Sequence, residues 1–197
     1  VVRKYQNPLL IDRSGTVNIQ AMRNDNPYGD SIDIPVAYHS ALAAEVNYQD
    51  PYSQWYTAGG ESGLVDGKLG TLNFRDGAWQ GFQGHDLVCT LKLNSPTRVS
   101  TVTANFYQYS NSWIFIPSEM SVEVSPDGEA WNNFGIVQSD SDPKKRGKFI
   151  KALKVKSNNV DEVLFIRLNA KSIGQVPSWH EAAGSEAWIF IDEIIAK

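Results

Sequence analysis

Apolar and polar residues alternate along much of this sequence. The alternation is regular in residues 87–93, where Leu, Cys and Leu are separated by more polar neighbours, and again in residues 120–125. A period of two places successive side chains on opposite faces of a β-strand, so both segments are predicted to be strands with one buried and one solvated face. A nearly continuous apolar run at 188–195 predicts a last strand that is buried on both faces. Further strands are expected at 17–22, 32–36, 102–106 and 163–168.

Turn-forming residues separate these segments. Pro126-Asp127-Gly128 stands between two of them and has the chemistry of a tight reversal. Long amphipathic helices are absent from the pattern, and only residues 36–46 could form a short one. Many short strands joined by loops rich in Gly, Asn and Ser favour an all-β sandwich.

The N-terminal stretch, residues 1–37, differs from the rest. It holds two or three short strands around a polar turn at 24–29, and so few strands cannot bury a core of their own. We therefore expect residues 1–37 to be the end of a preceding small β domain and residues 38–197 to form the main domain.

Composition narrows the function classes. The chain has 197 residues, 42% of them hydrophobic, and a net charge of −4, so it can bury a core but has no global attraction for nucleic acid or an anionic membrane. No apolar run approaches the roughly 18 residues that span a bilayer. The single cysteine, Cys89, alternates with leucines and is expected to be a small buried hydrophobe rather than a nucleophile.

Catalytic motifs are missing. Residues 63–68 are one position too short for a phosphate-binding loop, and Leu69 stands where a Ser or Thr should hold magnesium. His39, His85 and His180 are too scattered for a two-histidine zinc motif. A glycosidase would need two carboxylates facing one cleft, and it is kept only as an alternative. The basic segment 144–156 lacks interleaved aromatic residues and is expected to include a solvated edge strand protected by its lysines.

The loops carry large aromatic side chains. Trp55, Trp131 and Trp188 fall in apolar segments, for which core packing is the default expectation. The other three tryptophans stand among polar and small residues, together with Arg, Asn, Gln, His and Glu, in the segments 73–81, 107–113 and 178–181. An indole can carry the C–H face of a pyranose while polar neighbours bind its hydroxyls, so these loops are candidates for binding sugar. The alternative is that the rings plug the ends of the sandwich.

One turn has the composition of a cation site. Residues 64–71 place the carboxylate of Asp66, two glycines and the hydroxyl of Thr71 within one short segment. Oxygen donors of this kind suit a hard cation such as calcium. Taken alone, the segment is equally an ordinary Asp-Gly turn.

Together these segments resemble a known family. The motifs that carry the resemblance are Tyr56-Thr57-Ala58-Gly59-Gly60-Glu61, Leu64-Val65-Asp66-Gly67, Trp79-Gln80-Gly81-Phe82, Ser112-Trp113-Ile114-Phe115-Ile116-Pro117, Val122-Glu123-Val124-Ser125-Pro126-Asp127-Gly128 and Trp188-Ile189-Phe190-Ile191-Asp192-Glu193-Ile194. In this order, over about residues 45–197, they resemble the discoidin or coagulation-factor type C domain. The resemblance is greatest to the carbohydrate-binding version appended to bacterial β-hexosaminidases (chitobiases) of the Bacteroides type. Upstream, Tyr5, Pro8, Leu9, Thr16-Val17 and Ala21 are similar to the end of the small β domain that precedes this module in such enzymes.

The resemblance implies a discoidin-like jelly-roll β-sandwich that is not an enzyme. Such a module holds a catalytic domain, here an upstream glycoside hydrolase in the same polypeptide, near glycans that contain N-acetylhexosamine or galactose. It implies a monomer that binds no nucleic acid and does not insert into a membrane, and that acts in the periplasm or at the cell surface. The alternative is a structural or protein-interaction module that packs against a neighbouring domain without binding sugar.

The resemblance also implies site residues. The loop positions that it offers for carbohydrate are Arg75, Trp79, Asn111, Trp113, Trp179 and His180. It implies a structural calcium ion with ligands from Asp66, Thr71 and Glu193, or from Asp192 instead of Glu193 if the register differs by one residue. If the module binds sugar, at least one of the loop indoles should be open to solvent and lie close to Arg75 or His180.

Overall fold

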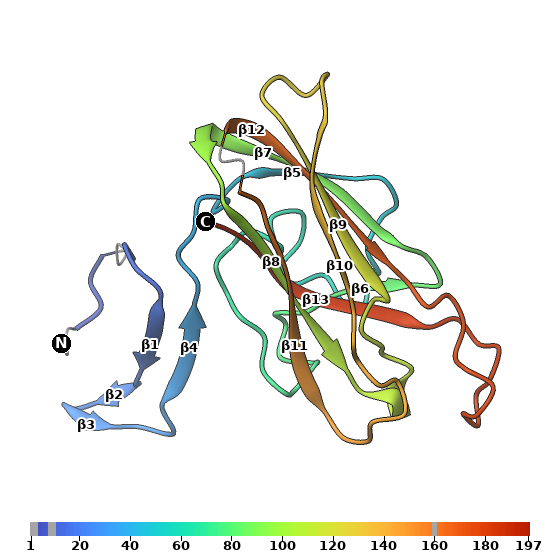
Figure 1. Cartoon of the computed structure of the whole chain (residues 1–197). Helices are drawn as coiled ribbons and strands as arrows, with labels where there is room; N and C mark the ends of the chain where they lie inside the picture. Colours follow the sequence, from blue (N-terminus) through green and yellow to red (C-terminus); the bar gives the residue numbers. More distant parts are fainter. Residues whose placement is uncertain (1–3, 8–10, 159–160) are drawn as a thin grey trace.

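The structure is a computed structural model that describes residues 4–7, 11–158 and 161–197 (Figure 1). In these ranges the regular structure consists of thirteen strands and one short 3-10 turn, η1 (Ser110–Ser112). No described segment forms a helix with the length and apolar character needed to cross a membrane.

Two antiparallel sheets pack face to face. The first has five strands in the order β10 (Asn132–Gln138), β9 (Glu119–Ser125), β12 (Glu162–Lys171), β7 (Leu87–Arg98) and β5 (Glu45–Tyr48). The second has four strands in the order β11 (Phe149–Lys156), β8 (Thr101–Gln108), β13 (Trp188–Ala196) and β6 (Gln80–Gln83). The expected all-β sandwich is confirmed, and the expected strands of the main domain all form.

The core lies between the sheets and follows the alternation in the sequence. Inward positions of β7, such as Leu87 and Leu91, are fully buried, and Phe106 and Ile191 face them from the second sheet. Cys89 belongs to the same core, and burial raises the pKa of its thiol to about 12. It is therefore the small buried hydrophobe that the sequence predicts.

Local turn chemistry also agrees with the sequence. The Asp127 carboxylate accepts hydrogen bonds from the Ser125 hydroxyl and from the backbone N–H groups of Glu129 and Ala130. Gly128 takes a φ of +84°, which glycine adopts without strain. The turn joins β9 to β10 as an antiparallel pair.

The short helix considered for residues 36–46 does not form. The backbone N–H groups of Ala37 and Ala43 donate instead to the carbonyls of Gly67 and Val65, and Ser40 donates to Ala196. These contacts tie the segment to distant parts of the chain, and a helix would require bonds four residues apart.

The lysine-bearing segment lies at an edge, as expected. β11 is the outer strand of the four-stranded sheet, and it carries Lys151, Lys154 and Lys156. Such charges oppose pairing with another chain along an open edge.

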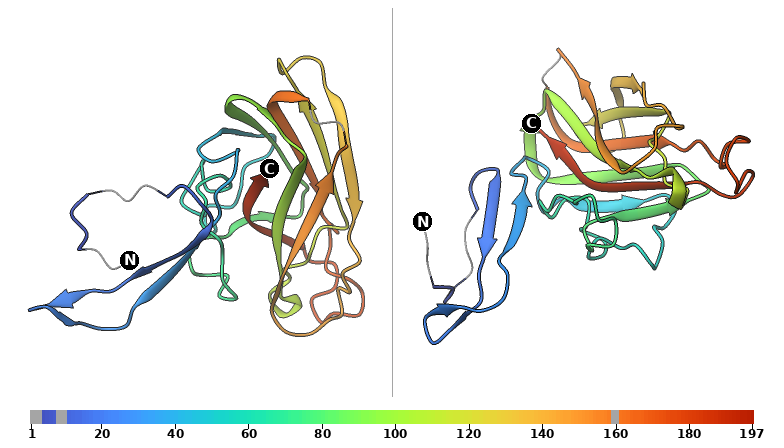
Figure 2. Two further views of the ribbon diagram at one scale, coloured as in Figure 1. Left: turned by 60° about the vertical axis from the view of Figure 1, so that its left-hand side comes forward. Right: turned by 90° about the horizontal axis from the view of Figure 1, so that it is seen from below.

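The N-terminal residues form a ribbon that projects from the sandwich (Figure 2). In it β1 (Gly15–Ile19) pairs with β4 (Ile32–Val36), and the short strands β2 (Met22–Arg23) and β3 (Asn26–Pro27) pair beyond them. The directly opposed pairs Val17–Ile34 and Ile19–Ile32 place apolar side chains on one face. That residues 1–37 end a preceding β domain stays a prediction, and Pro8 and Leu9 lie outside the described residues.

Long loops gather at one end of the sandwich, which we call the loop end. They are residues 53–58, 72–79, 109–118, 139–148 and 172–187, and the last three lie toward the bottom of Figure 1. The Phe74 ring lies 6.5 Å from the Tyr109 ring, and the Gln108 side chain donates to the Asp142 carbonyl at 2.9 Å. The chain therefore brings segments more than thirty residues apart to one surface.

Candidate functional site

A hollow of about 510 Å³ lies at the loop end, and we call it the aromatic hollow. Its walls come from the loops around positions 55 and 75 and from the first residue of β13. Its lining residues are Trp55, Tyr56, Thr57, Ala58, Phe74, Arg75, Gly77, Trp79 and Trp188. Its size is within the range of about 300–1,000 Å³ that is usual for small-ligand sites.

Trp55 is the most exposed aromatic side chain at the hollow. A tight turn presents it: the Tyr56 N–H donates to the Ser53 carbonyl, and the Trp55 N–H donates to the Ser53 hydroxyl. Both ends of this turn are bonded to Gly81 of β6, at 2.8 and 3.0 Å. The backbone is therefore held firmly, while the Trp55 side chain remains 86% exposed.

A layer of packed rings supports the hollow from beneath. The Tyr56 ring lies 4.5 Å from Phe190 and 5.5 Å from Trp188, and Phe74 lies 5.8 Å from Phe190. A Cβ at Gly81 would come within 2.9 Å of Phe190 and 3.0 Å of Tyr56. Glycine at this position therefore permits the close approach that fixes these rings.

Trp79 forms part of the floor and does not display its ring. It is 1% exposed, its indole N–H donates to the Thr71 carbonyl at 3.1 Å, and its ring meets Tyr107 at 5.1 Å. Trp79 is therefore not the open loop indole that sugar binding requires, and the alternative that such a ring plugs the end of the sandwich describes it. Its loop folds back over Gly70, where a Cβ would lie 2.2 Å from the indole.

Arg75 supplies the charge at the hollow. Its guanidinium lies 5.2 Å from the centre of the Phe74 ring, and the side chain is exposed. The loop that carries it is closed by Asp76, whose carboxylate accepts from the Thr71 N–H and hydroxyl and from the Ala78 N–H. Arg75 therefore projects from a loop with internal hydrogen bonds, beside the aromatic wall.

A smaller polar hollow adjoins the first. It has a volume of about 290 Å³ and shares Trp55 and Trp188 with the aromatic hollow. Its other lining residues are Pro51, Ser53, Gln54, Gln83 and His85. The two tryptophans thus stand between an aromatic wall and a set of hydroxyl, amide and imidazole groups.

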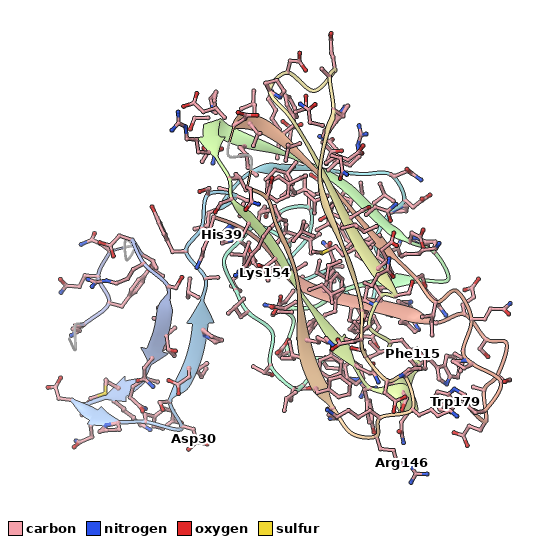
Figure 3. All side chains as sticks on the ribbon, viewed as in Figure 1. Asp30, His39, Phe115, Arg146, Lys154 and Trp179 are labelled. Carbon is pink, nitrogen blue, oxygen red and sulfur yellow. The ribbon has the colours of Figure 1, made fainter. Side chains whose placement is uncertain are left out.

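The remaining expected sugar-binding residues lie at a neighbouring corner of the loop end. Trp113 is half-buried against the small cluster around Phe115, and Trp179 is 40% exposed with its ring 6.5 Å from Phe115 (Figure 3). The His180 ring lies 5.7 Å from Trp179. Asn111 is exposed on η1. None of these four lines either hollow, so the expected set is divided between two places.

Core packing was the wrong default for Trp55 and incomplete for Trp188. Trp188 begins β13 but is half-buried and lines both hollows. Trp131 is also half-buried, with the Arg167 guanidinium 3.7 Å above its ring. A signal for Trp55 was present: Ser53 and Gln54 precede it, and Tyr56 follows without the alternation of a strand.

Among the residues that the structure describes, no Asp or Glu lines either hollow. Hydrolysis of a glycoside commonly requires two carboxyl groups on opposite sides of the scissile bond. The lining can therefore bind and orient a sugar, and it offers no such acid–base pair.

The residues expected to hold calcium lie outside both hollows. They belong to a group that we call the carboxylate turn, which consists of residues 64–71, His39, Asp192 and Glu193. Glu193 is fully buried. Its Oε1 lies 2.9 Å from Nε2 of His39, and its Oε2 accepts from the Gly67 N–H at 3.1 Å. Burial raises the pKa of Glu193 to about 9 and lowers that of His39 to about 4. Both oxygens of Glu193 are therefore already engaged.

Asp66 and Thr71 have other partners as well. The Asp66 carboxylate accepts from the Lys68 backbone N–H at 2.9 Å and from its ammonium group at 2.6 Å. The Thr71 hydroxyl donates to Asp76. In the part of the chain that the structure describes, no three His, Cys, Asp or Glu side chains are grouped so that they could hold a metal ion. In this structure Asp66, Thr71 and Glu193 are bonded to other protein groups. Chelation tests whether they bind the calcium ion that the resemblance implies.

Asp192 is a second buried carboxyl of the carboxylate turn. A bulge between Ile191 and Ile194 lets β13 bury both Asp192 and Glu193. Oδ2 of Asp192 accepts from the Gly70 N–H at 2.9 Å, whereas Oδ1 makes no hydrogen bond of ordinary geometry among the described residues. Burial raises the pKa of this carboxyl to about 7, although the nearby Asn105 side chain favours its charged form. A single carboxyl is far from the six to eight ligands of calcium.

Comparison with solved structures defines the class of fold. The chain is similar to a family 32 carbohydrate-binding module from Streptococcus pneumoniae EndoD, with a TM-score of 0.56, 11% identity, and coverage of 81% of this chain and 99% of that one. Carbohydrate-binding modules are non-catalytic domains. The chain thus has the discoidin-like fold of that module, as its sequence motifs implied.

Two further structures match with lower TM-scores. One is a Clostridium perfringens domain in complex with GalNAc-β-1,3-galactose (TM-score 0.45, 15% identity, 79% of this chain and 94% of that one). The other is the C-terminal domain of a Bacteroides fragilis chitobiase (TM-score 0.41, 15% identity, 78% and 93%). No protein-family model matches the sequence, and no curated protein matches it.

Proposed function

We propose that this chain is a non-catalytic carbohydrate-binding module whose sugar site is the aromatic hollow with the adjoining polar hollow. The observation that carries the proposal is the 86% exposed Trp55 at the boundary of the two hollows. A large exposed ring on a backbone held at both ends loses little freedom when a ligand covers it.

The two hollows match the two sides of a sugar. A pyranose presents an apolar C–H face, which the indole of Trp55 or Trp188 can cover. Its hydroxyls need donors and acceptors, and Gln54, Gln83 and His85 supply them on the other side. The site is open and small, so we expect a Kd of about 10⁻⁵ to 10⁻³ M.

Weak binding suits a module that acts beside an enzyme. The module would hold an attached glycoside hydrolase, of the β-hexosaminidase or chitobiase type, close to glycans that contain N-acetylhexosamine or galactose. Attachment and a multivalent surface raise the effective concentration and offset the modest affinity. We propose the periplasm or the cell surface as its location.

The test is a titration of the folded chain with N-acetylglucosamine, N-acetylgalactosamine, galactose and their disaccharides, followed by tryptophan fluorescence and NMR. We expect saturable binding with a blue-shifted emission, because a bound sugar removes water from Trp55. Absence of binding to every sugar at millimolar concentration would overturn the proposal and leave the structural module. Release of product from aryl glycosides would show instead that the chain is catalytic.

A further inference from the structure

Of the described residues that line the aromatic hollow, Arg75 is the one with a charged side chain. Thr57 is polar, and the rest of the lining is aromatic or small. The polar hollow beside it is also free of carboxylates. The two linings together therefore carry one positively charged side chain, although the chain as a whole carries −4.

The nearest acidic residue in sequence, Asp76, forms no ion pair with Arg75. Both oxygens of Asp76 accept hydrogen bonds within its own loop, from Thr71 and Ala78. Arg75 makes no ion pair with any residue that the structure describes. Its guanidinium instead lies over the Phe74 ring, which orients it beside the space that a ligand would fill.

A second cation, Lys148, lies beside a ring that neighbours Phe74. The Lys148 ammonium lies 5.3 Å from the centre of the Tyr109 ring, and that ring lies 6.5 Å from Phe74. Lys148 belongs to a loop that also carries Lys144, Lys145 and Arg146, and Arg146 lies at the tip of the loop end in Figure 3. The nearby acid Asp140 is paired with Lys151.

From this arrangement we propose that the sugar bound in the aromatic hollow carries an anionic group, a carboxylate or a sulfate, which Arg75 binds. The inference rests on the proposed function and names the class of its ligand. A guanidinium presents two parallel N–H groups that match the two oxygens of such an anion. The Phe74 ring beside it, 5.2 Å from the guanidinium, adds a cation–π contact that favours one orientation of the guanidinium. Lys148 adds a longer-range attraction, which salt screens.

The experiment compares matched saccharides that differ only in charge. N-acetylglucosamine 6-sulfate is paired with N-acetylglucosamine, and a galacturonic acid oligomer is paired with its methyl ester. Binding to the full chain is measured by calorimetry at about 20 mM and about 500 mM sodium chloride. We expect the acidic member of at least one pair to bind about tenfold more tightly at low salt, with a smaller difference at high salt. The pair that responds identifies sulfate or carboxylate.

Variants of Arg75 test whether this residue causes the preference for the acidic saccharide. Arg75→Gln should reduce the ratio of acidic to neutral affinity to less than about twofold, and Arg75→Lys should leave an intermediate ratio because it keeps charge without the two-pronged geometry. Lys154→Gln removes one positive charge from β11, outside both hollows, and should keep the ratio of the unaltered chain.

The outcomes separate the two proposals. Equal affinity for acidic and neutral members would overturn the anionic ligand and leave the sugar site standing. An acidic preference that survives in Arg75→Gln would overturn the role of Arg75. Failure of every saccharide to bind would overturn both.

Discussion

The aromatic hollow and the carboxylate turn both contain residues that the sequence marks as functional, but the fold uses them in opposite ways. In the hollow, the Trp55 and Arg75 side chains reach solvent, and Arg75 forms no ion pair with a described residue. In the turn, Glu193 and Asp66 are bonded to His39, Gly67 and Lys68. A ligand can bind where polar and aromatic groups are accessible and unsatisfied, and groups bonded to each other stabilise the fold instead.

The largest effect is expected at the floor of the hollow. Trp79→Ala should lower the free energy of unfolding by about 3–5 kcal/mol, because it removes a buried ring and leaves a cavity. Urea denaturation measures this. Trp55→Ala is the matched control, and its free energy of unfolding should change by less than about 0.5 kcal/mol. Equal losses in the two variants would mean that Trp55 is also structural.

The second largest effect on stability is expected at the carboxylate turn. Glu193→Ala should lower the free energy of unfolding by on the order of 3 kcal/mol, because the Gly67 N–H and the His39 ring lose their partner inside the protein. Glu193→Gln keeps the size and one acceptor and should cost less. Thermal melts of both variants show whether Glu193→Ala loses more stability than Glu193→Gln. A Glu193→Ala protein as stable as the unaltered chain would contradict the structural role of the turn.

A smaller free-energy change, confined to binding, is expected at the rim of the hollow. Trp55→Ala should weaken saccharide binding by at least about tenfold, or roughly 1.4 kcal/mol, because it removes the exposed stacking surface. NMR titration measures the Kd. Trp131→Ala serves as the control, since it removes a tryptophan beside the β9–β10 turn, and its Kd should be unchanged. Loss of binding in Trp131→Ala alone would place the site elsewhere.

The smallest effect is expected from metal removal. The oxygens of Glu193 and Asp66 already have hydrogen-bond partners, so chelation with EDTA should leave the melting temperature unchanged, and added calcium should not raise it. Differential scanning fluorimetry tests both. A rise with calcium that EDTA reverses would show that the carboxylate turn rearranges around an ion.

Much of the fold follows from local pattern. The alternation at 87–93 and 120–125 predicts β7 and β9 because a strand with one buried face must repeat every two residues. Pro126-Asp127-Gly128 predicts the turn between β9 and β10 because its side-chain acceptor and its glycine act over four residues. The segment 36–46 does not form the short helix considered for it, because its backbone partners, Gly67, Val65 and Ala196, lie far along the chain.

The candidate site was predicted only in part. Arg75 was correctly placed at an open loop, and Trp179 does expose its ring beside His180. The exposure of Trp55 and the burial of Trp79 were both missed. Each depends on a contact that sequence spacing does not show: the Ser53–Tyr56 turn bonds to Gly81, and the Trp79 ring covers Gly70.

By itself, the sequence determined the strands, the tight turn, the sandwich and the presence of aromatic loops, because these depend on residue periodicity and on interactions between near neighbours. Only the tertiary structure decided which rings are open and which carboxylates are satisfied. Exposure and hydrogen bonding depend on where distant loops meet, and here the loops around positions 55 and 75 meet the start of β13.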